Sequence, residues 1–120
     1  MRVEEGAVPL SEWSRWVAEL LTDNGFPDPV LEHRIEQDGC LVAQVDLAYP
    51  HLRVAIELDS VSFHIRRHRI TPDAVRRNDI GNAGWHLQTV TWELYAARTA
   101  TLLQQLGDAC ELRRQISRVA

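Results

Sequence analysis

The stretch Val42–His64, VAQVDLAYPHLRVAIELDSVSFH, predicts two β-strands joined by a tight turn. In the second strand, apolar residues alternate with Ala55, Glu57 and Asp59. Because successive side chains of a strand point to opposite faces, this alternation places the two acids on the same face of a sheet. A third acid, Asp46, lies in the first strand. The predicted hairpin therefore carries three carboxylates at a spacing that the packing of a core does not require.

The predicted turn also sets which residues face each other across this hairpin. If the turn centres on His51 and Leu52, Asp46 lies directly opposite Glu57. Like charges at directly opposite positions destabilise a strand pair, so they need solvent or a cation between them. The spacing leaves two interpretations open, which are a face whose acids are solvated and a metal site.

The length of 120 residues favours a single domain with a core of its own. We expect this domain to span residues 9–118, with residues 1–8 as a flexible N-terminus. The apolar fraction of 45% and the charged fraction of 25% are typical of globular proteins and exclude the disordered and fibrous classes. No apolar run approaches about 18 residues, and no basic start precedes an apolar segment, so neither a membrane span nor a secretory signal is predicted. We expect a cytoplasmic protein that does not act at membranes.

Cysteine spacing and net charge narrow the functional classes further. Cys40 and Cys110 belong to no C-x-x-C pair, which argues against a zinc knuckle or a dithiol redox site. Reduced thiols are therefore expected. The formal net charge of -4 argues mildly against a general nucleic-acid binder, for which an excess of positive charge is usual.

The positive charge is unevenly distributed, however. All 13 basic residues are arginine, and five of them lie between His64 and Arg77, where Asp73 is the only acid. These five are Arg66, Arg67, Arg69, Arg76 and Arg77. A guanidinium presents a planar pair of donors that matches two phosphate oxygens, so the cluster could bind a nucleic-acid backbone. The alternative is a solvated helix face that acids elsewhere balance.

The remaining elements follow from apolar periodicity and turn residues. The expected order is helix, three strands, helix, strand and helix, which is typical of a small α/β or α+β layer structure. The expected ranges are a helix from Ser11 to Gly25, strands at 30–36, at the residues around Asp46 and at 53–60, a helix from Thr71 to about Ala83, a strand at 85–92 and a helix from Leu94 to about Arg118. A hairpin turn is expected at residues 37–39.

Capping and breaking residues set the expected helix ends. Ser11 is the expected N-cap of the first helix. Thr71 is the expected N-cap of the second helix, with Pro72 at its first position and Gly84 as its stop. Gly107 marks an expected break in the last helix. The tryptophans expected in the core are Trp13, Trp16, Trp85 and Trp92.

Several motifs in this order resemble a known family. They are a tryptophan-striped first helix that ends in NGFPDP, followed by VDLAYP, VAIELDSVSFH, RRND and AGWHLQTVTW. Between Ser11 and Leu106 the chain thereby resembles the small nucleases of the PD-(D/E)XK superfamily, in the branch of domains of unknown function related to very-short-patch-repair (Vsr-like) endonucleases. The resemblance implies a restriction-endonuclease-like fold, with a central mixed sheet of about four strands flanked by helices. It also implies metal-dependent hydrolysis of DNA phosphodiester bonds.

The resemblance assigns roles to individual residues. Asp46, Glu57 and Asp59 match the metal-binding and catalytic acids, and their hard carboxylate oxygens suit Mg²⁺ or Mn²⁺. His64 matches the histidine that follows the acids, which implies that it protonates the leaving oxygen or holds the phosphate. Without the family pattern, a single histidine after a strand is more typical of a surface or capping residue. DNA is the implied partner, with the five arginines between residues 66 and 77 as its contacts.

Two positions depart from the family pattern. Asp59 stands where the superfamily usually has a lysine, and an acid at this position is common in this branch. The glutamate of the first helix falls at Ser14, and Glu12 lies on a different side of that helix. The second departure favours an alternative, a catalytically impaired nuclease-fold domain that acts as a DNA-binding or protein-interaction module. A homodimer, or a partner within a larger system, is compatible with either function.

Overall fold

The structure is a computed structural model that describes residues 9–59 and 63–119, with the backbone alone for residues 63–70. Residues 1–8, expected to be a flexible N-terminus, lie outside the described residues. In chain order the described elements are α1 (Leu10–Asp23), β1 (Val30–Gln37), β2 (Cys40–Tyr49), β3 (Val54–Asp59), α2 (Phe63–Asn82), β4 (His86–Thr91), α3 (Trp92–Ala97) and α4 (Thr99–Val119). No described helix is long and apolar enough to cross a membrane.

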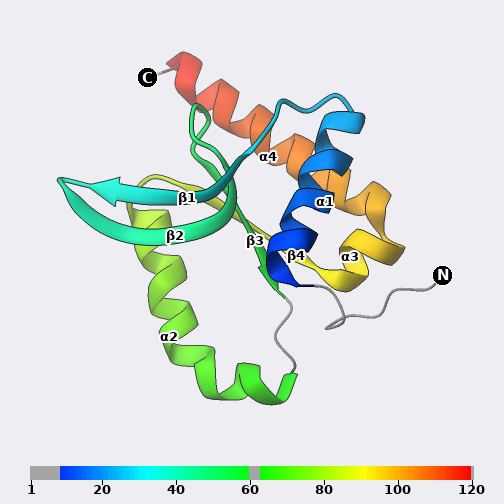
Figure 1. Ribbon diagram of the computed structural model, residues 1–120. Helices are drawn as coiled ribbons and strands as arrows, with labels where there is room; N and C mark the ends of the chain where they lie inside the picture. The colour runs from blue at the N-terminus through cyan, green and yellow to red at the C-terminus, as the bar shows by residue number, and fades with distance from the viewer. Residues whose placement is uncertain (1–8, 60–62, 120) are drawn as a thin grey trace.

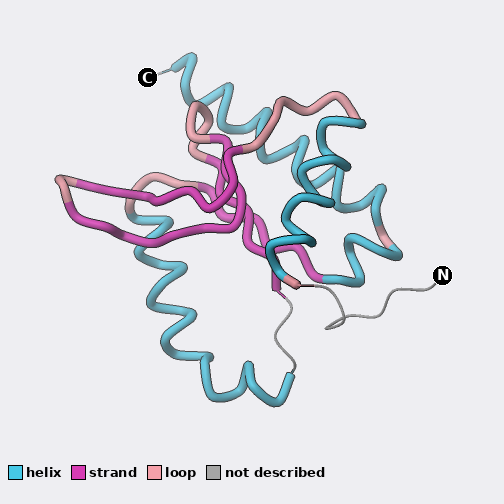
Figure 2. The backbone as a smooth tube through the Cα atoms, in the orientation of Figure 1, coloured by secondary structure: helices cyan, strands magenta, loops and turns pink. Residues whose placement is uncertain are grey.

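The four strands form one mixed sheet, as predicted. Their order is β1-β2-β3-β4, with antiparallel pairs β1–β2 and β2–β3 and a parallel pair β3–β4. The turn between β1 and β2 is made by Asp38 and Gly39, with φ angles of 53° and 79°. Glycine and aspartate enter this left-handed region more readily than most residues, which is why the predicted turn forms here. The β1–β2 hairpin extends beyond the rest of the sheet as a curved arm (Figure 2).

The register of β2 and β3 is the predicted one. Leu47 pairs with Ile56 and Tyr49 pairs with Val54, so the turn centres on the two residues expected from the sequence. The Leu52 amide donates to the Tyr49 carbonyl oxygen at 3.0 Å and closes this turn. The hydrophobic spacing of the two strands therefore fixes their alignment.

Helices cover both faces of the sheet and make three layers (Figure 1). The α1, α3 and α4 layer lies on one face, over Val54, Ile56 and Leu58 of β3. The α2 helix covers the other face through Ile80 and Ala83. The mixed α+β architecture with helices on both sides of a central sheet agrees with the fold class predicted from the sequence.

An aromatic cluster joins α1 to α3 within the first of these layers. Trp13 is 2% exposed and makes edge contacts with Trp92 and Tyr95, at ring-centroid distances of 5.3 and 6.3 Å. Trp16 is half-buried, and so are Trp85 and Trp92. The prediction of a core tryptophan is thus confirmed for Trp13, while Trp92 and Trp85 pack at the edge of the two core clusters and Trp16 belongs to neither cluster.

The expected start of the second helix is wrong. Thr71 is not an N-cap, because α2 already begins at Phe63 and Pro72 lies inside it. Arginine is a good helix former, so the arginine-rich segment extends the helix toward its N-terminus. A proline inside a helix removes one backbone hydrogen bond and kinks the axis, and α2 changes direction along its length (Figure 1).

Two other helix ends also differ from the prediction. The first helix begins at Leu10, with Pro9 in the cap position and no side-chain cap, so Ser11 lies within its first turn. The C-terminal helical region breaks at Arg98, which separates α3 from α4, and Gly107 lies inside α4. The short helix α3 that precedes this break starts at an N-cap that the prediction missed, since the Thr91 hydroxyl oxygen accepts a hydrogen bond from the Leu94 amide at 3.1 Å.

Candidate functional site

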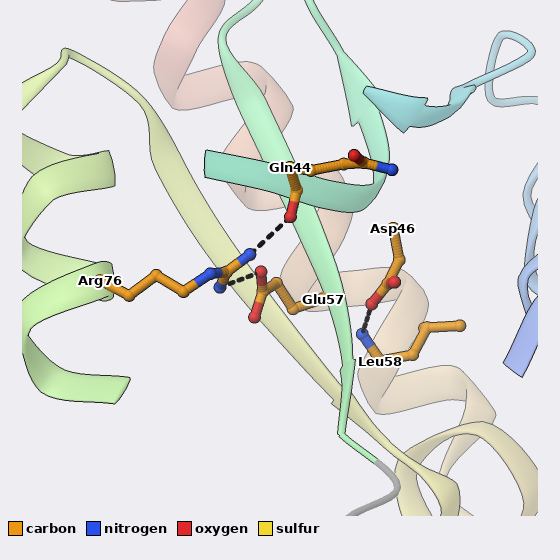
Figure 3. Close-up of polar contacts among 5 residues, drawn as sticks. All are labelled: Gln44, Asp46, Glu57, Leu58 and Arg76. Carbon is orange, nitrogen blue, oxygen red and sulfur yellow. Dashed lines mark hydrogen bonds and ion pairs between the residues drawn. The ribbon is translucent and has the colours of Figure 1, made fainter. Parts of the chain in front are cut away.

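Asp46 lies where β2 departs from regular pairing. Glu32 and Asp46 would face each other in a regular β1–β2 ladder, but they are not paired. Glu32 has a φ of 52°, which is outside the range of a regular strand. On the other side, the β2–β3 register ends one residue away, at Leu47. The Asp46 Oδ2 atom instead accepts a hydrogen bond from the Leu58 amide at 2.8 Å (Figure 3). A side-chain carboxylate thus holds β2 to β3 just beyond their last paired residues.

The alternation of side chains along β2 changes phase at this point. Ala43 and Val45 pack in the same cluster as Ala48, on the α2 side of the sheet. In a regular strand, residues of odd and even number would face opposite sides. The change lets the far half of the β1–β2 hairpin pack on α2 while Asp46 remains half-buried beside β3.

Glu57 is bound by an arginine from α2. It lies on the face of β3 that α2 covers, and its Oε1 forms an ion pair with Arg76 Nη1 (Figure 3). The other terminal nitrogen of the same guanidinium donates to the Gln44 carbonyl oxygen at 2.6 Å. The side chains of Arg76 and Glu57 are 35% and 20% exposed. One arginine therefore connects α2 to both β2 and β3.

Burial raises the pKa of both acids. Desolvation raises the pKa of Asp46 most, the Leu58 amide and the Arg76 charge lower it in part, and the Glu32 charge raises it again. Desolvation also raises the pKa of Glu57; Arg76 lowers it, and the negative charge of Asp46 raises it further. The ionised forms of the two carboxylates thus carry a cost that Arg76 offsets only in part, and an additional cation would reduce it.

This arrangement predicts a specific pH dependence of stability in the metal-free protein. The folded-state pKa values of Asp46 and Glu57 lie above their ordinary values of 3.8 and 4.5. The folded state therefore keeps these protons longer than the unfolded state does, and the stabilisation present below about pH 4 is lost as pH rises through the raised values. Urea denaturation in chelator should show a smaller loss between pH 4 and 8 for Asp46→Asn than for the wild type. A loss of equal size in both proteins would contradict the prediction.

The remaining predicted site residues differ in how far the structure describes them. Asp59 is the last residue of β3, half-buried and paired with Thr91 of β4. Its position two residues after Glu57 places it on the same face of the strand, as predicted. The backbone of His64 is part of α2, but the structure does not describe its side chain. The same holds for the side chains of Arg66, Arg67 and Arg69.

The two described arginines of the cluster have different surroundings. Arg76 faces Glu57 and Gln44, whereas the Arg77 side chain is exposed and its charge lowers the pKa of Glu57 from a distance. The sequence predicted both arginines as phosphate contacts. The contact of Arg76 with one of the acids is new information, because it depends on which side of α2 meets the sheet.

The donor set can be compared with the needs of a cation. Among the side chains that the structure describes, those of residues 9–59 and 71–119, no group of three or more His, Cys, Asp and Glu is arranged to hold a metal ion. The structure does bring Asp46 and Glu57 near each other, with Arg76 at Glu57. Mg²⁺ keeps several water ligands and is commonly held by one or two carboxylates, so Asp46 and Glu57 are the described acids that could contribute ligands, and in this structure Arg76 already pairs with Glu57.

The first helix offers no acid at the position expected from the family pattern. Ser14 is 7% exposed, and its hydroxyl donates to the Leu10 carbonyl oxygen at 3.0 Å. Glu12 and Glu19 are both exposed on α1. The negative charge of Glu32 raises the pKa of Asp46, but the sequence analysis did not place Glu32 at the site. Its position follows from the irregular backbone of β1 at this residue, which no local sequence pattern indicates.

The chain is similar to two curated proteins of Mycobacterium tuberculosis. It is 30% identical over 66 residues to Uncharacterized protein MT2308 of strain CDC 1551 / Oshkosh, and to the same extent to Uncharacterized protein Rv2248 of strain ATCC 25618 / H37Rv. The matched residues cover 55% of this chain and 24% of each relative, so the chain spans about a quarter of the length of these relatives. No family model matches the chain, and no solved structure matches it.

Proposed function

We propose that the chain is a metal-dependent endonuclease domain that hydrolyses DNA phosphodiester bonds. The observation that carries the proposal is the pair Asp46 and Glu57, two half-buried carboxylates of raised pKa on neighbouring strands beside an arginine-rich helix. Acids whose pKa values are perturbed by burial and by each other's charge are candidates for a functional site, and two neighbouring carboxylates favour a cation between them. The resemblance of the sequence motifs to the PD-(D/E)XK nucleases points to the same chemistry.

The residues of the chain take separate roles in this proposal. Asp46 and Glu57 would hold Mg²⁺ or Mn²⁺, with Asp59 as a further acid on the same face of β3 as Glu57. When bound, the cation would lower the pKa of an attacking water and stabilise negative charge on the phosphate. The Leu58 amide keeps the Asp46 carboxylate in place. His64 donates a proton to the leaving oxygen.

A catalytically impaired nuclease-fold domain is the second candidate function. Two observations favour it, the ion pair that Arg76 makes with Glu57 and the buried serine at position 14 where the family has a glutamate. In this form the domain would bind DNA or another protein without cleaving DNA. A second copy of the chain, or a component of a larger system, would then be its partner.

The two candidates differ in what the unmodified chain does to DNA. As an endonuclease, the purified chain should convert supercoiled plasmid to nicked or linear DNA in Mg²⁺ and stop when a chelator is added. Because the reaction needs no other component, gel analysis of a time course is sufficient. Plasmid that stays supercoiled at saturating Mg²⁺, while a mobility shift shows binding, would instead establish the non-enzymatic function.

DNA binding should depend on the arginines of α2. Each phosphate contact that is lost flattens the plot of log affinity against log salt by about 0.9 units for duplex DNA, so replacing Arg66, Arg67 and Arg69 with alanine should remove up to about three units. The matched control replaces Arg98, Arg114 and Arg118. These three are exposed in the helical layer across the sheet from α2 and change the net charge equally. Equal loss of slope in both triple variants would show that net charge alone governs binding.

The cytoplasm is the proposed location. Cys40 and Cys110 are free thiols in the structure, which fits a reducing compartment. The chain matches only about a quarter of each of its relatives. The cytoplasmic location and the nuclease activity are therefore proposed for this domain alone.

A further inference from the structure

The guanidinium of Arg76 occupies the place at Glu57 that a metal ion would need. It forms an ion pair with the Oε1 atom of this carboxylate, and its second terminal nitrogen donates to the Gln44 carbonyl oxygen at 2.6 Å (Figure 3). The contacts cross from α2 to two strands, and the Arg76 and Glu57 side chains are both half-buried, at 35% and 20% exposed. The Glu57 carboxylate is therefore already paired with a cation that belongs to the chain.

Two positive charges at one carboxylate repel each other, and the repulsion is stronger where burial lowers the effective dielectric constant. A divalent ion that binds between Asp46 and Glu57 must therefore displace the guanidinium or bind more weakly. The displaced guanidinium does not lose all its partners, because the Gln44 carbonyl oxygen remains within its reach. Its freed terminal nitrogen would then be available to another anion, and a guanidinium matches phosphate oxygens in geometry and charge.

Resting on the proposed function, we propose that Arg76 competes with the divalent cation for Glu57 in the unloaded protein and turns to a phosphate oxygen of DNA when the cation is bound. The arginine then sets a threshold for loading, since the cation must displace it from Glu57. DNA lowers this threshold by offering the guanidinium a second anion. Both the metal ion and the DNA phosphate need the ion pair between Arg76 and Glu57 to open. Metal and DNA should consequently bind with positive cooperativity, because whichever binds first opens this ion pair for the other.

The competition can be measured with Mn²⁺ alone, by isothermal titration of the wild type, Arg76→Gln and Arg77→Gln. Arg76→Gln should bind Mn²⁺ about ten-fold more tightly than the wild type, the ratio that corresponds to about 1.4 kcal/mol. Arg77→Gln removes the same charge one residue away, where the side chain is exposed, and should change the affinity much less. In Ca²⁺, which is used to hold DNA without turnover, Arg76→Gln should bind a duplex more weakly than the wild type.

A measurement on the wild type keeps the test independent of how well the variants fold. The Nε–H resonance of Arg76 should shift when Mg²⁺ is added. The corresponding resonance of Arg113, whose Nε donates to the Leu52 carbonyl oxygen at 2.8 Å, should stay in place. Mn²⁺ binding by the wild type that Arg76→Gln leaves unchanged, or an Arg76 resonance that does not move at saturating Mg²⁺, would overturn the inference and leave the proposed function intact. Failure of all three proteins to bind Mn²⁺ would overturn both.

Discussion

Replacing Asp46 with asparagine is expected to lower the rate of Mg²⁺-dependent DNA cleavage by at least about 100-fold. An asparagine keeps an oxygen that can accept the hydrogen bond from the Leu58 amide, so the local structure of β2 and β3 should persist. What it loses is the negative charge that would hold the cation beside Glu57. Because burial raises the pKa of Asp46, removal of this charge should leave the metal-free protein at least as stable as the wild type.

Single-turnover cleavage of a labelled duplex, together with urea denaturation in chelator, would measure both effects. The matched control is Asp23→Asn, which makes the same chemical change at an exposed residue at the end of α1. It should retain the wild-type rate. An Asp46→Asn protein that cleaves DNA at more than about a tenth of the wild-type rate would be incompatible with a metal site at Asp46.

Replacing Trp13 with alanine should give the largest loss of stability in the chain, about 3–5 kcal/mol. The indole is 2% exposed and contacts Trp92 and Tyr95, so its removal leaves a large cavity between α1 and α3. Single domains are commonly stable by only about 5–15 kcal/mol, so this loss removes a large part of the free energy of unfolding and should lower the melting temperature markedly. Trp13→Phe should lose less, since it keeps most of the ring packing and removes an Nε1 atom that is buried without a hydrogen-bond partner among the described residues.

Trp16→Ala is the control on the same helix, and its side chain is half-buried. Chemical denaturation followed by circular dichroism should show a clearly smaller loss for Trp16→Ala than for Trp13→Ala. Losses of equal size would mean that the cluster of Trp13, Trp92 and Tyr95 has no special part in holding α1 and α3 together.

The strands of this fold could be predicted because their information is local. Alternation in β3 and the turn residues before it determine the register with β2. The paired residues end at Leu47 and Ile56, so the predicted direct opposition of Asp46 and Glu57 lies one step beyond the last pair. The departure at Asp46 could not be predicted. It requires the unusual backbone of Glu32 and the packing of the β1–β2 hairpin on α2, which join residues distant in sequence.

The helices show the opposite case, in which strong local signals were misleading. Thr71, Pro72 and Asp73 resemble the start of a helix, yet the helix runs through them from Phe63. The start and the kink of α2 decide which of its arginines reach the sheet. The contact of Arg76 with Glu57 was therefore beyond sequence reasoning, although both residues had been predicted in the site.

A crystal structure of the wild type soaked in Mn²⁺, with anomalous diffraction to locate the ion, tests the central claim most directly. We predict an anomalous peak between the carboxylates of Asp46 and Glu57, with the Arg76 guanidinium displaced from Glu57. A structure at saturating Mn²⁺ that has no peak there, and in which Arg76 still forms its ion pair with Glu57, would contradict the claim that these acids form a metal site.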